Sequence, residues 1–331
     1  FHYLHYNEEQ LCDLTEYNGY HRTYVDNEGF LWIKNQFKLK LYDIHKESFV
    51  TNTDSILKTL GIHRPLKNFF MDTDCNYWFQ TTDDQLIYRN CKYGESRLIL
   101  TEISGLGGKE DMLYDLAVIE KHVFLFYRSG ATACYEIENA NELYRENPFG
   151  QQEKNYINTL QVVPYMQYLY QLRNGDNGGI MHSFNTKSRK WNKIIETDIS
   201  LNTLTVDKEG NCWISAQNGF WFIDKFQTEK RHTTQLQLVD GRVFESVIYT
   251  QYNDKEGGFW IGTSNRGLLY YHPERFKFRN FGRTLFKQNN GSELMVYSFC
   301  KDESQMLVGT QQGLFRYTIT EGNMPVSIPL S

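Results

Sequence analysis

Residues that could carry catalytic or metal chemistry are present in this chain, but they are not grouped in the patterns that such chemistry needs. The nine histidines include no HExxH motif and no cysteine–histidine set with zinc-binding spacing. Two carboxylate pairs, Asp72 with Asp74 and Asp83 with Asp84, lack the glycine and the distal glutamate of a calcium loop. Neither a Gly-x-Ser-x-Gly nucleophile motif nor a phosphate-binding loop is present. We therefore predict no catalytic residue, no bound metal and no cofactor.

Ligand binding is better supported than catalysis, because polar side chains recur in short segments between two β-rich runs. Amide and guanidinium groups hydrogen-bond well to hydroxyls and carboxylates, as in sugars and uronic acids. The candidate ligand-binding residues are Gln36, Asp83, Arg128, Arg173, Asn174, Asp176, Asn218, Asn265, Arg266 and Gln311. The rings of Phe37 and Tyr127 are candidates for stacking on a sugar. An ordinary solvated rim of polar residues is the alternative interpretation for each position.

A repeated segment separates and positions these polar segments. Residues 254–271 read DKEGGFWIGTSNRGLLYY, and residues 207–224 read DKEGNCWISAQNGFWFID. Related copies begin at Asp26, Asp72 and Asp302. Self-similarity at a fixed period indicates the architecture more strongly than local propensity does.

The tryptophan of each copy, or the apolar residue in its place, allows the copies to be counted. These anchor positions are Trp32, Trp78, Phe124, Leu169, Trp213, Trp260 and Leu307. Their spacings are 46, 46, 45, 44, 47 and 47 residues, and a four-stranded propeller blade repeats at roughly 40–50 residues. We therefore expect an all-β fold, a seven-bladed β-propeller of four-stranded antiparallel blades that spans residues 1–320.

Each clear copy has the same internal order: a β-rich run, an Asp-x-x-Gly turn, an apolar strand with the tryptophan, a short polar segment and a Gly-Leu-x-x-Tyr strand. Aspartate can hydrogen-bond the backbone of its own turn, and glycine supplies positive φ. We interpret these residues as structural, with the tryptophans packed between adjacent blades. The polar segments then meet at one mouth of the central channel, where function tends to lie. The longest of them, residues 173–179, lies in a degenerate copy and is the strongest candidate.

The two ends of the chain carry further predictions. The aromatic residues in residues 1–6 (FHYLHY) have the same spacing as those in residues 276–281 (FKFRNF), which should form the outer strand of the sixth blade. The last copy shows no comparable run after Tyr317. We therefore expect residues 1–6 to be the outer strand of the last blade and to close the ring, which covers an exposed edge. Residues 321–331 are expected to form a linker towards a following domain.

Composition excludes several classes of partner. The net charge of the 331-residue chain is −5, which gives no electrostatic case for nucleic-acid binding. No run approaches the roughly 20 apolar residues of a membrane span, so we expect no membrane contact by this chain. No signal peptide is visible at its start. The six cysteines contain no CxxC pair; buried free thiols are expected, although spacing alone does not exclude a disulfide.

The D-x-x-G-x-x-W-I-G-T…G-L-x-x-Y unit resembles the two-component-regulator propeller repeat, most clearly in the copies that begin at Asp26, Asp207 and Asp254. That repeat builds the periplasmic sensor regions of hybrid two-component systems in glycan-degrading gut bacteria. The resemblance covers essentially the whole chain. It implies a periplasmic, non-enzymatic sensor that recognises an oligosaccharide and relays the signal to a kinase outside this chain. It also implies a second propeller and an immunoglobulin-like domain of the same protein as partners, and a homodimer as an arrangement of the full-length protein.

Two other functions are compatible with a propeller. A polysaccharide lyase or glycosidase needs a carboxylate pair or metal-binding histidines at the channel mouth. The polar segments supply only Asp83, Asp84 and Asp176 as carboxylates, and no histidine. A protein–protein interaction scaffold would instead present a large apolar patch on one face.

Overall fold

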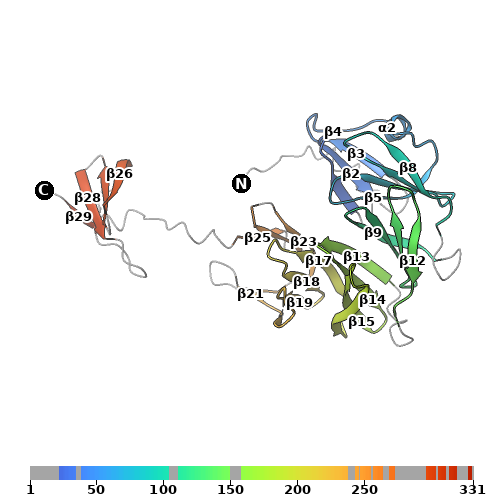
Figure 1. Cartoon of the computed structure of the whole chain (residues 1–331). Helices are drawn as coiled ribbons and strands as arrows, with labels where there is room; N and C mark the ends of the chain where they lie inside the picture. Colours follow the sequence, from blue (N-terminus) through green and yellow to red (C-terminus); the bar gives the residue numbers. More distant parts are fainter. Residues whose placement is uncertain are drawn as a thin grey trace. The chain divides into compact units, whose positions relative to one another are not determined.

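The computed structural model in Figure 1 shows a chain made almost entirely of β-strands. It describes residues 22–34, 39–103, 111–149, 158–237, 243–245, 247–254, 256–263, 268–272, 296–302, 305–310, 313–318 and 327–329. The chain divides into two units, Phe1–Tyr270 and Tyr271–Ser331, and each is described by itself.

Within the first unit, strands that follow one another in the chain pair in antiparallel sheets. The first sheet contains β1 (Arg22–Val25), β2 (Phe30–Lys34), β3 (Leu39–Asp43) and β4 (Ser48–Phe49). The second contains β5 (Leu66–Met71), β6 (Tyr77–Thr81), β7 (Leu86–Arg89) and β8 (Ser96–Leu100). The third contains β9 (Leu113–Ile119), β10 (His122–Tyr127), β11 (Thr132–Glu136) and β12 (Glu142–Glu146). The helix α2 (Thr53–Thr59) connects the first sheet to the second.

The next sheets continue the same pattern. The fourth contains β13 (Asn158–Tyr165), β14 (Tyr168–Gly175), β15 (Gly178–Asn185) and β16 (Lys190–Thr197). The fifth contains β17 (Leu201–Val206), β18 (Cys212–Ala216), β19 (Gly219–Ile223) and β20 (Lys230–Thr233). A short ribbon of β21 (Leu236–Gln237) and β22 (Val243–Phe244) precedes the three-stranded sheet of β23 (Ile248–Asn253), β24 (Phe259–Thr263) and β25 (Leu268–Tyr271). In the second unit, β26 (Val296–Asp302), β27 (Gln305–Thr310), β28 (Gly313–Thr318) and β29 (Ser327–Pro329) form a four-stranded sheet.

The architecture is therefore an all-β propeller of four-stranded antiparallel blades, as the repeat predicted. Every anchor position lies in the second strand of its sheet, including the two weak ones, Phe124 in β10 and Leu169 in β14. The number of blades differs from the prediction. The described residues form six four-stranded blades and not seven, because the sixth copy contributes only β23, β24 and β25. The run 276–281, expected as its fourth strand, lies outside the described residues.

The prediction for the last blade was wrong in its premise. The run after Tyr317 was expected to leave the outer position empty, but β29 pairs with β28 and fills it. A proline-containing segment can form such a strand because an edge strand has one side without a partner. Residues 1–6, the proposed closing strand, lie outside the described residues.

The Asp-x-x-Gly turns have the structural role that was predicted, with one addition. One carboxylate oxygen of Asp26 accepts the backbone N–H groups two and four residues later, each at 2.9 Å. The other oxygen accepts the indole N–H of Trp32 at 2.7 Å. Asp207 and Trp213 repeat this bond at 3.0 Å. The turn glycine Gly210 has a φ of +93°, which the turn requires. The aspartate thus fixes both the turn and the tryptophan.

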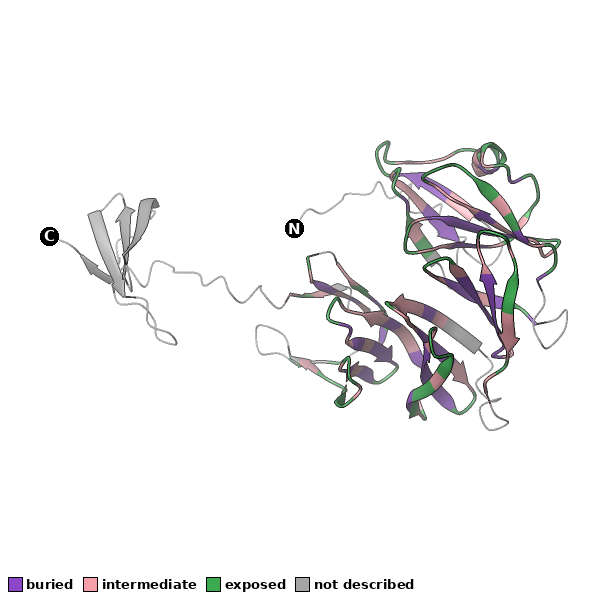
Figure 2. Cartoon of the chain, in the orientation of Figure 1, coloured by how far each residue is buried: buried purple, intermediate pink, exposed green. Residues whose placement is uncertain are grey.

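Apolar side chains between neighbouring blades form the core. Trp32 of the first blade is 1% exposed and stacks on Phe69 of the second at 4.8 Å between ring centroids. Trp213 of the fifth blade lies 5.1 Å from Phe259 of the sixth. The buried positions in Figure 2 accordingly concentrate along the inner parts of the sheets. Packing between blades, as predicted for the tryptophans, therefore holds the first unit together.

The two degenerate blades lack the motif because they use a different turn. The residue Ile119 pairs directly with His122, and Tyr165 pairs directly with Tyr168. Only two residues connect the first and second strands in each of these blades. A two-residue turn has no place for the Asp-x-x-Gly sequence, so the shortened turn accounts for the missing residues.

Candidate functional site

The connections between the second and third strands of the blades share one structural context. In the second blade the backbone N–H of Thr82 donates to Pro65 O at 3.0 Å. In the third, Arg128 N–H donates to Met112 O at 2.8 Å. In each case the acceptor lies in the segment before the blade's first strand. We call the edge formed by these connections the hairpin face, defined by residues 81–85, 127–131, 175–178 and 216–219.

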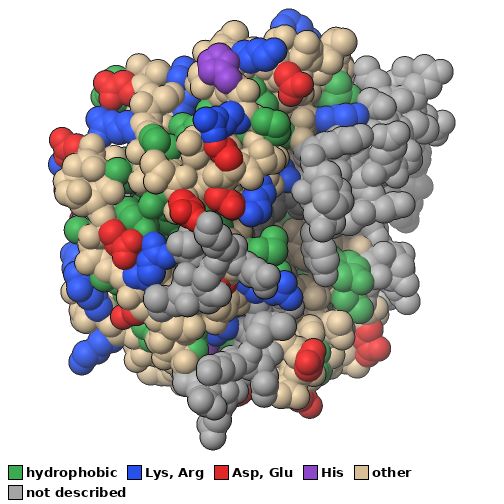
Figure 3. Space-filling model, turned by 90° about the vertical axis from the view of Figure 1, so that its right-hand side faces the viewer, with side chains coloured by type: hydrophobic (Ala, Val, Ile, Leu, Met, Phe, Trp, Pro, Cys, Tyr) green, Lys and Arg blue, Asp and Glu red, His purple; other side chains and the backbone are tan. Residues whose placement is uncertain are grey.

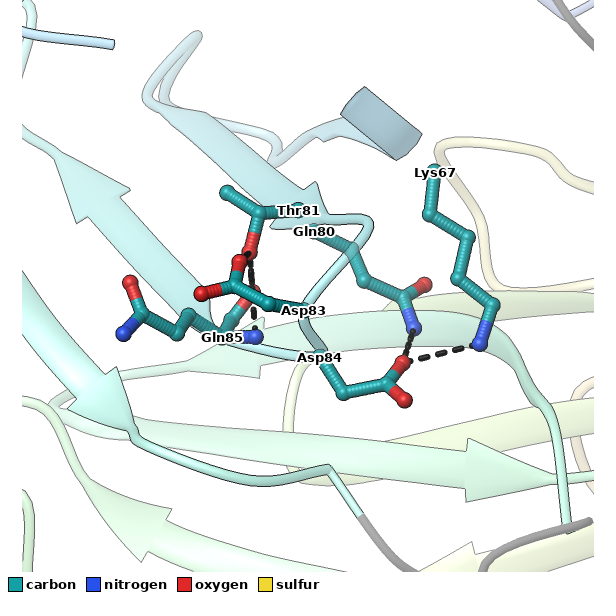
Figure 4. A network of polar contacts seen from close by, with 6 residues as sticks. All are labelled: Lys67, Gln80, Thr81, Asp83, Asp84 and Gln85. Carbon is teal, nitrogen blue, oxygen red and sulfur yellow. Dashed lines mark hydrogen bonds and ion pairs between the residues drawn. The ribbon is translucent and has the colours of Figure 1, made fainter. Parts of the chain in front are cut away.

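In the second blade, a network of polar side chains surrounds the connection (Figure 4). Lys67, on the first strand, and Asp84 form an ion pair at 2.8 Å, and the amide of Gln80 donates to the same carboxylate at 3.3 Å. The hydroxyl of Thr81 donates to Asp83 at 2.6 Å. The side chains of Lys67 and Asp84 remain 40% and 33% exposed, so the ion pair is partly open to solvent.

Asp83, one of the predicted site residues, is held from two sides. Its carboxylate accepts the Thr81 hydroxyl and forms an ion pair with Arg64, which lies in the segment before β5. The sequence prediction included Asp83 but missed Arg64 and Lys67. Neither cation belongs to a polar segment of the repeat, so spacing alone gave no signal for them.

In the third blade, Arg128 is exposed at the tip of its connection. The next residue fixes this tip, because Ser129 donates through its backbone N–H and its hydroxyl to Asp111, at 2.9 and 2.6 Å. Tyr127 was expected to stack on a ligand, and that expectation was wrong. The ring is 0% exposed, and burial raises the pKa of its hydroxyl above the ordinary range.

The fourth blade overturns the strongest candidate segment. Residues 173–179 do not form a long loop, because β14 and β15 pair as far as Gly175 with Gly178. Arg173 is 0% exposed, and its guanidinium lies 4.2 Å from the ring centroid of Phe149. The neighbouring Asn174 is also structural, because its amide bonds the backbone N–H and carbonyl of Leu201 at 3.0 and 2.8 Å.

Two further predicted residues lie at exposed tips. Asp176 lies in the two-residue turn between β14 and β15, and Asn218 lies in the equivalent turn between β18 and β19. The hairpin face thus presents Asp83, Arg128, Asp176 and Asn218 on successive blades. The remaining predicted residues, Gln36, Asn265, Arg266 and Gln311, lie outside the described residues, as does Phe37.

A buried histidine lies behind this face in the fourth blade. His182 is 3% exposed and packs 4.7 Å from the ring of Phe149. Desolvation, with the charges of Arg173 and Lys193 as smaller contributions, lowers the pKa of His182 to about 3. The imidazole is therefore neutral at physiological pH and contributes no charge to the hairpin face.

Metal ligands and membrane-spanning helices are not found in the described part of the chain. There, no group of three or more His, Cys, Asp or Glu side chains comes together as a set of metal ligands. The described helices include none that is long and apolar enough to span a membrane. The cysteines Cys75, Cys91, Cys134 and Cys212 are free thiols. On the face shown in Figure 3, acidic and basic side chains are interspersed rather than separated.

Comparison with solved structures finds the same fold in an extracellular domain from B. thetaiotaomicron. The chain aligns over 93% of its length with an extracellular domain of BT4673 from B. thetaiotaomicron, described as a putative hybrid two component system, with a TM-score of 0.55 and 13% identity. A second structure of this domain, described as a putative one component system, aligns with a TM-score of 0.54, 13% identity and the same coverage of this chain. The alignments span 39% and 40% of those structures. No protein-family model matches the sequence, and no curated protein matches it.

Proposed function

We propose that this chain is the ligand-sensing propeller of a hybrid two-component system. The observation that carries the proposal is the fold shared over 93% of the chain with the extracellular domain of a protein described as such a system. The chain binds the signal and has no catalytic activity of its own. The kinase that responds lies outside it.

The finer features of the proposal follow the repeat. The seven anchor positions correspond to the six four-stranded blades and the three-stranded sheet of the sixth copy, and we place the chain in the periplasm. Because the chain spans only 39% of the similar structure, a second propeller and an immunoglobulin-like domain of the same protein are its proposed partners, and the full-length protein is a homodimer.

The proposed ligand is an oligosaccharide, and the hairpin face is its binding site. The exposed tips carry a guanidinium, carboxylates and an amide, which together match the hydroxyl and carboxylate groups of sugars and uronic acids. Bonds such as Ser129 to Asp111 hold a tip in place before the ligand arrives, which lowers the entropy lost on binding. The proposed contacts are Asp83, Arg128, Asp176 and Asn218, together with the polar residues of the other copies, Gln36, Asn265, Arg266 and Gln311.

Signalling proceeds by a shift between two arrangements of the sensor. A ligand shifts such an equilibrium only by its difference in affinity for the two states. A ligand that contacts several blades at once has such a difference in affinity, because it binds best when those blades hold one relative position.

Calorimetric titration of the intact protein with neutral and uronic-acid oligosaccharides tests the proposal. We expect at least one oligosaccharide to bind and to change kinase activity. Absence of binding across the panel contradicts an oligosaccharide sensor. Turnover of any of these oligosaccharides contradicts the non-enzymatic role and supports a lyase or glycosidase.

A further inference from the structure

A hollow lies at the opposite ends of the strands from the hairpin face. In the second blade, β6 begins after the turn that contains Asp74 and ends at the connection that contains Asp83, so the two residues belong to opposite faces. The first-to-second strand turns of the second, third and fourth blades surround a cavity of about 560 Å³. The polar residues that line it are Thr73, Asp74, Glu120, Gln167 and Lys187. This volume is within the range of small-molecule sites, roughly 300–1,000 Å³.

The shortened turns of the degenerate blades contribute to this hollow. Glu120 and Gln167 lie in the two-residue turns of the third and fourth blades, whereas the second blade has the longer turn that begins at Asp72. The longer turn therefore lies beside two shorter ones. The loss of the Asp-x-x-Gly motif in these two blades therefore shapes the hollow, and departures from a structural rule often coincide with functional sites.

The charged groups of the cavity are not paired with each other. Among the described residues, the side chains of Asp74, Glu120, Gln167 and Lys187 make no hydrogen bond or ion pair. The groove next to it differs, because there Arg97 pairs with Glu95 at 3.4 Å. Two carboxylates and one ammonium therefore face the cavity with their hydrogen-bonding capacity available to a ligand.

We propose that this cavity binds a small ligand that carries a primary ammonium group. Asp74 and Glu120 approach the cavity from two blades, and two carboxylates together bind a cation better than either alone. The amide of Gln167 and the ammonium of Lys187 supply hydrogen bonds for hydroxyl or carbonyl groups of the same ligand. Met166, which is 72% exposed, provides apolar surface for its carbon skeleton.

The neighbouring groove extends the site. Its volume is about 460 Å³, and Glu120 lines both hollows. Tyr93, 68% exposed, also lines this groove; Lys92 lies over one face of its ring, and the other face can stack on a ligand. A ligand with several amine-bearing units can therefore continue from the cavity past Glu120, and we expect an oligomer to bind more tightly than its single unit.

Titration calorimetry of the full chain at low salt tests the proposal. The probes are the disaccharide of glucosamine, its N-acetylated form, and spermidine. The free-amine disaccharide and spermidine represent two sources of the same ammonium chemistry. We expect at least one of them to bind, the acetylated form not to bind, and the affinity to fall as salt is added. Absence of binding by both amines, or equal binding of the acetylated form, overturns the proposal.

Matched variants locate the binding. Glu120→Gln and Asp74→Asn should each weaken the amine by about tenfold, because each removes a charged hydrogen-bond acceptor. Glu209→Gln is the control, because Glu209 holds the turn position of Asp74 in the fifth blade and does not line the cavity. Lys187→Gln should strengthen amine binding severalfold, since it removes a like charge. Unchanged affinity in both carboxylate variants refutes the site. None of these variants alters the hairpin face. A negative result would therefore refute the amine site without bearing on the proposed oligosaccharide sensor, which has a separate test.

Discussion

Substitution of Asp26 by asparagine should destabilise the protein more than the same change in any other turn that the structure describes. The carboxylate is 6% exposed, and one of its oxygens accepts two side-chain donors, Trp32 N–H at 2.7 Å and Tyr77 O–H at 2.8 Å. Tyr77 belongs to the second blade, so this oxygen also connects two blades. Asparagine places either a weaker acceptor or an NH₂ group opposite these two donors.

The magnitude follows from the bonds that are lost. A hydrogen bond to a charged group contributes roughly 1.5–3 kcal/mol, so the loss of two gives roughly 3–6 kcal/mol for Asp26→Asn. Asp207→Asn is the matched comparison, because its second oxygen accepts Trp213 and the amide of Asn211, each at 3.0 Å, in a partly buried turn. Both bonds lie in a partly buried turn where water can replace part of the lost acceptor, so we expect roughly 1–2 kcal/mol there.

The assay is denaturant unfolding followed by tryptophan fluorescence and far-ultraviolet circular dichroism. Tyr77→Phe, alone and combined with Asp26→Asn, isolates the bond between the blades, and we expect a coupling of about 1–2 kcal/mol. A cost below about 1 kcal/mol for Asp26→Asn, or one no larger than that of Asp207→Asn, would refute the reasoning.

Two further predictions concern backbone and protonation. Gly219→Ala should lower the free energy of unfolding by more than about 3 kcal/mol, because φ is +122° and a Cβ would lie 2.0 Å from Thr233 O. The control is Gly94→Ala, where φ is +70° and no atom lies closer than 3.8 Å to the added Cβ; it should cost only about 1 kcal/mol. Equal costs for the two variants would contradict this explanation. His182 is neutral in the fold, with its pKa lowered to about 3, so its contribution to stability is present above pH 6.5 and is lost as the pH falls towards 3. Lowering the pH from 7 to 5 should therefore cost roughly 2 kcal/mol, and His182→Gln should reduce this loss; an unchanged pH dependence in the variant would contradict the assignment.

The repeat made the fold predictable because the same few residues determine each turn. Asp and Gly in the turn, with the tryptophan six residues after the aspartate, place the first two strands of a blade in register, as at Asp207, Gly210 and Trp213. In the third and fourth blades, where the motif is absent, the spacing of about 45 residues still located the second strand of each blade. The helix α2 was not predicted, because it has only seven residues and depends on local features: the Asn52 cap and the burial of Leu57.

The candidate site was less predictable, because it depends on pairing and on contacts distant in sequence. The polar sequence of residues 173–179 predicted a loop, but the pairing of β14 with β15 continues to Gly175 and Gly178. Arg173 is buried against Phe149, a residue in a different blade connection that no spacing rule relates to it. In contrast, Arg128 and Asn218 lie within two residues of the end of a blade's second strand, and there the repeat identified exposed tips correctly.

The central claim, an oligosaccharide sensor that reads its ligand at the hairpin face, is tested most directly by one titration. The affinity of the intact protein for its best oligosaccharide is measured for the wild type, Arg128→Ala and Arg231→Ala. Arg231 is a matched exposed arginine on the outer strand β20, with its side chain 70% exposed. We expect Arg128→Ala to weaken binding about tenfold or more and Arg231→Ala to leave it within about twofold. Binding that is equal in all three proteins would contradict the claim.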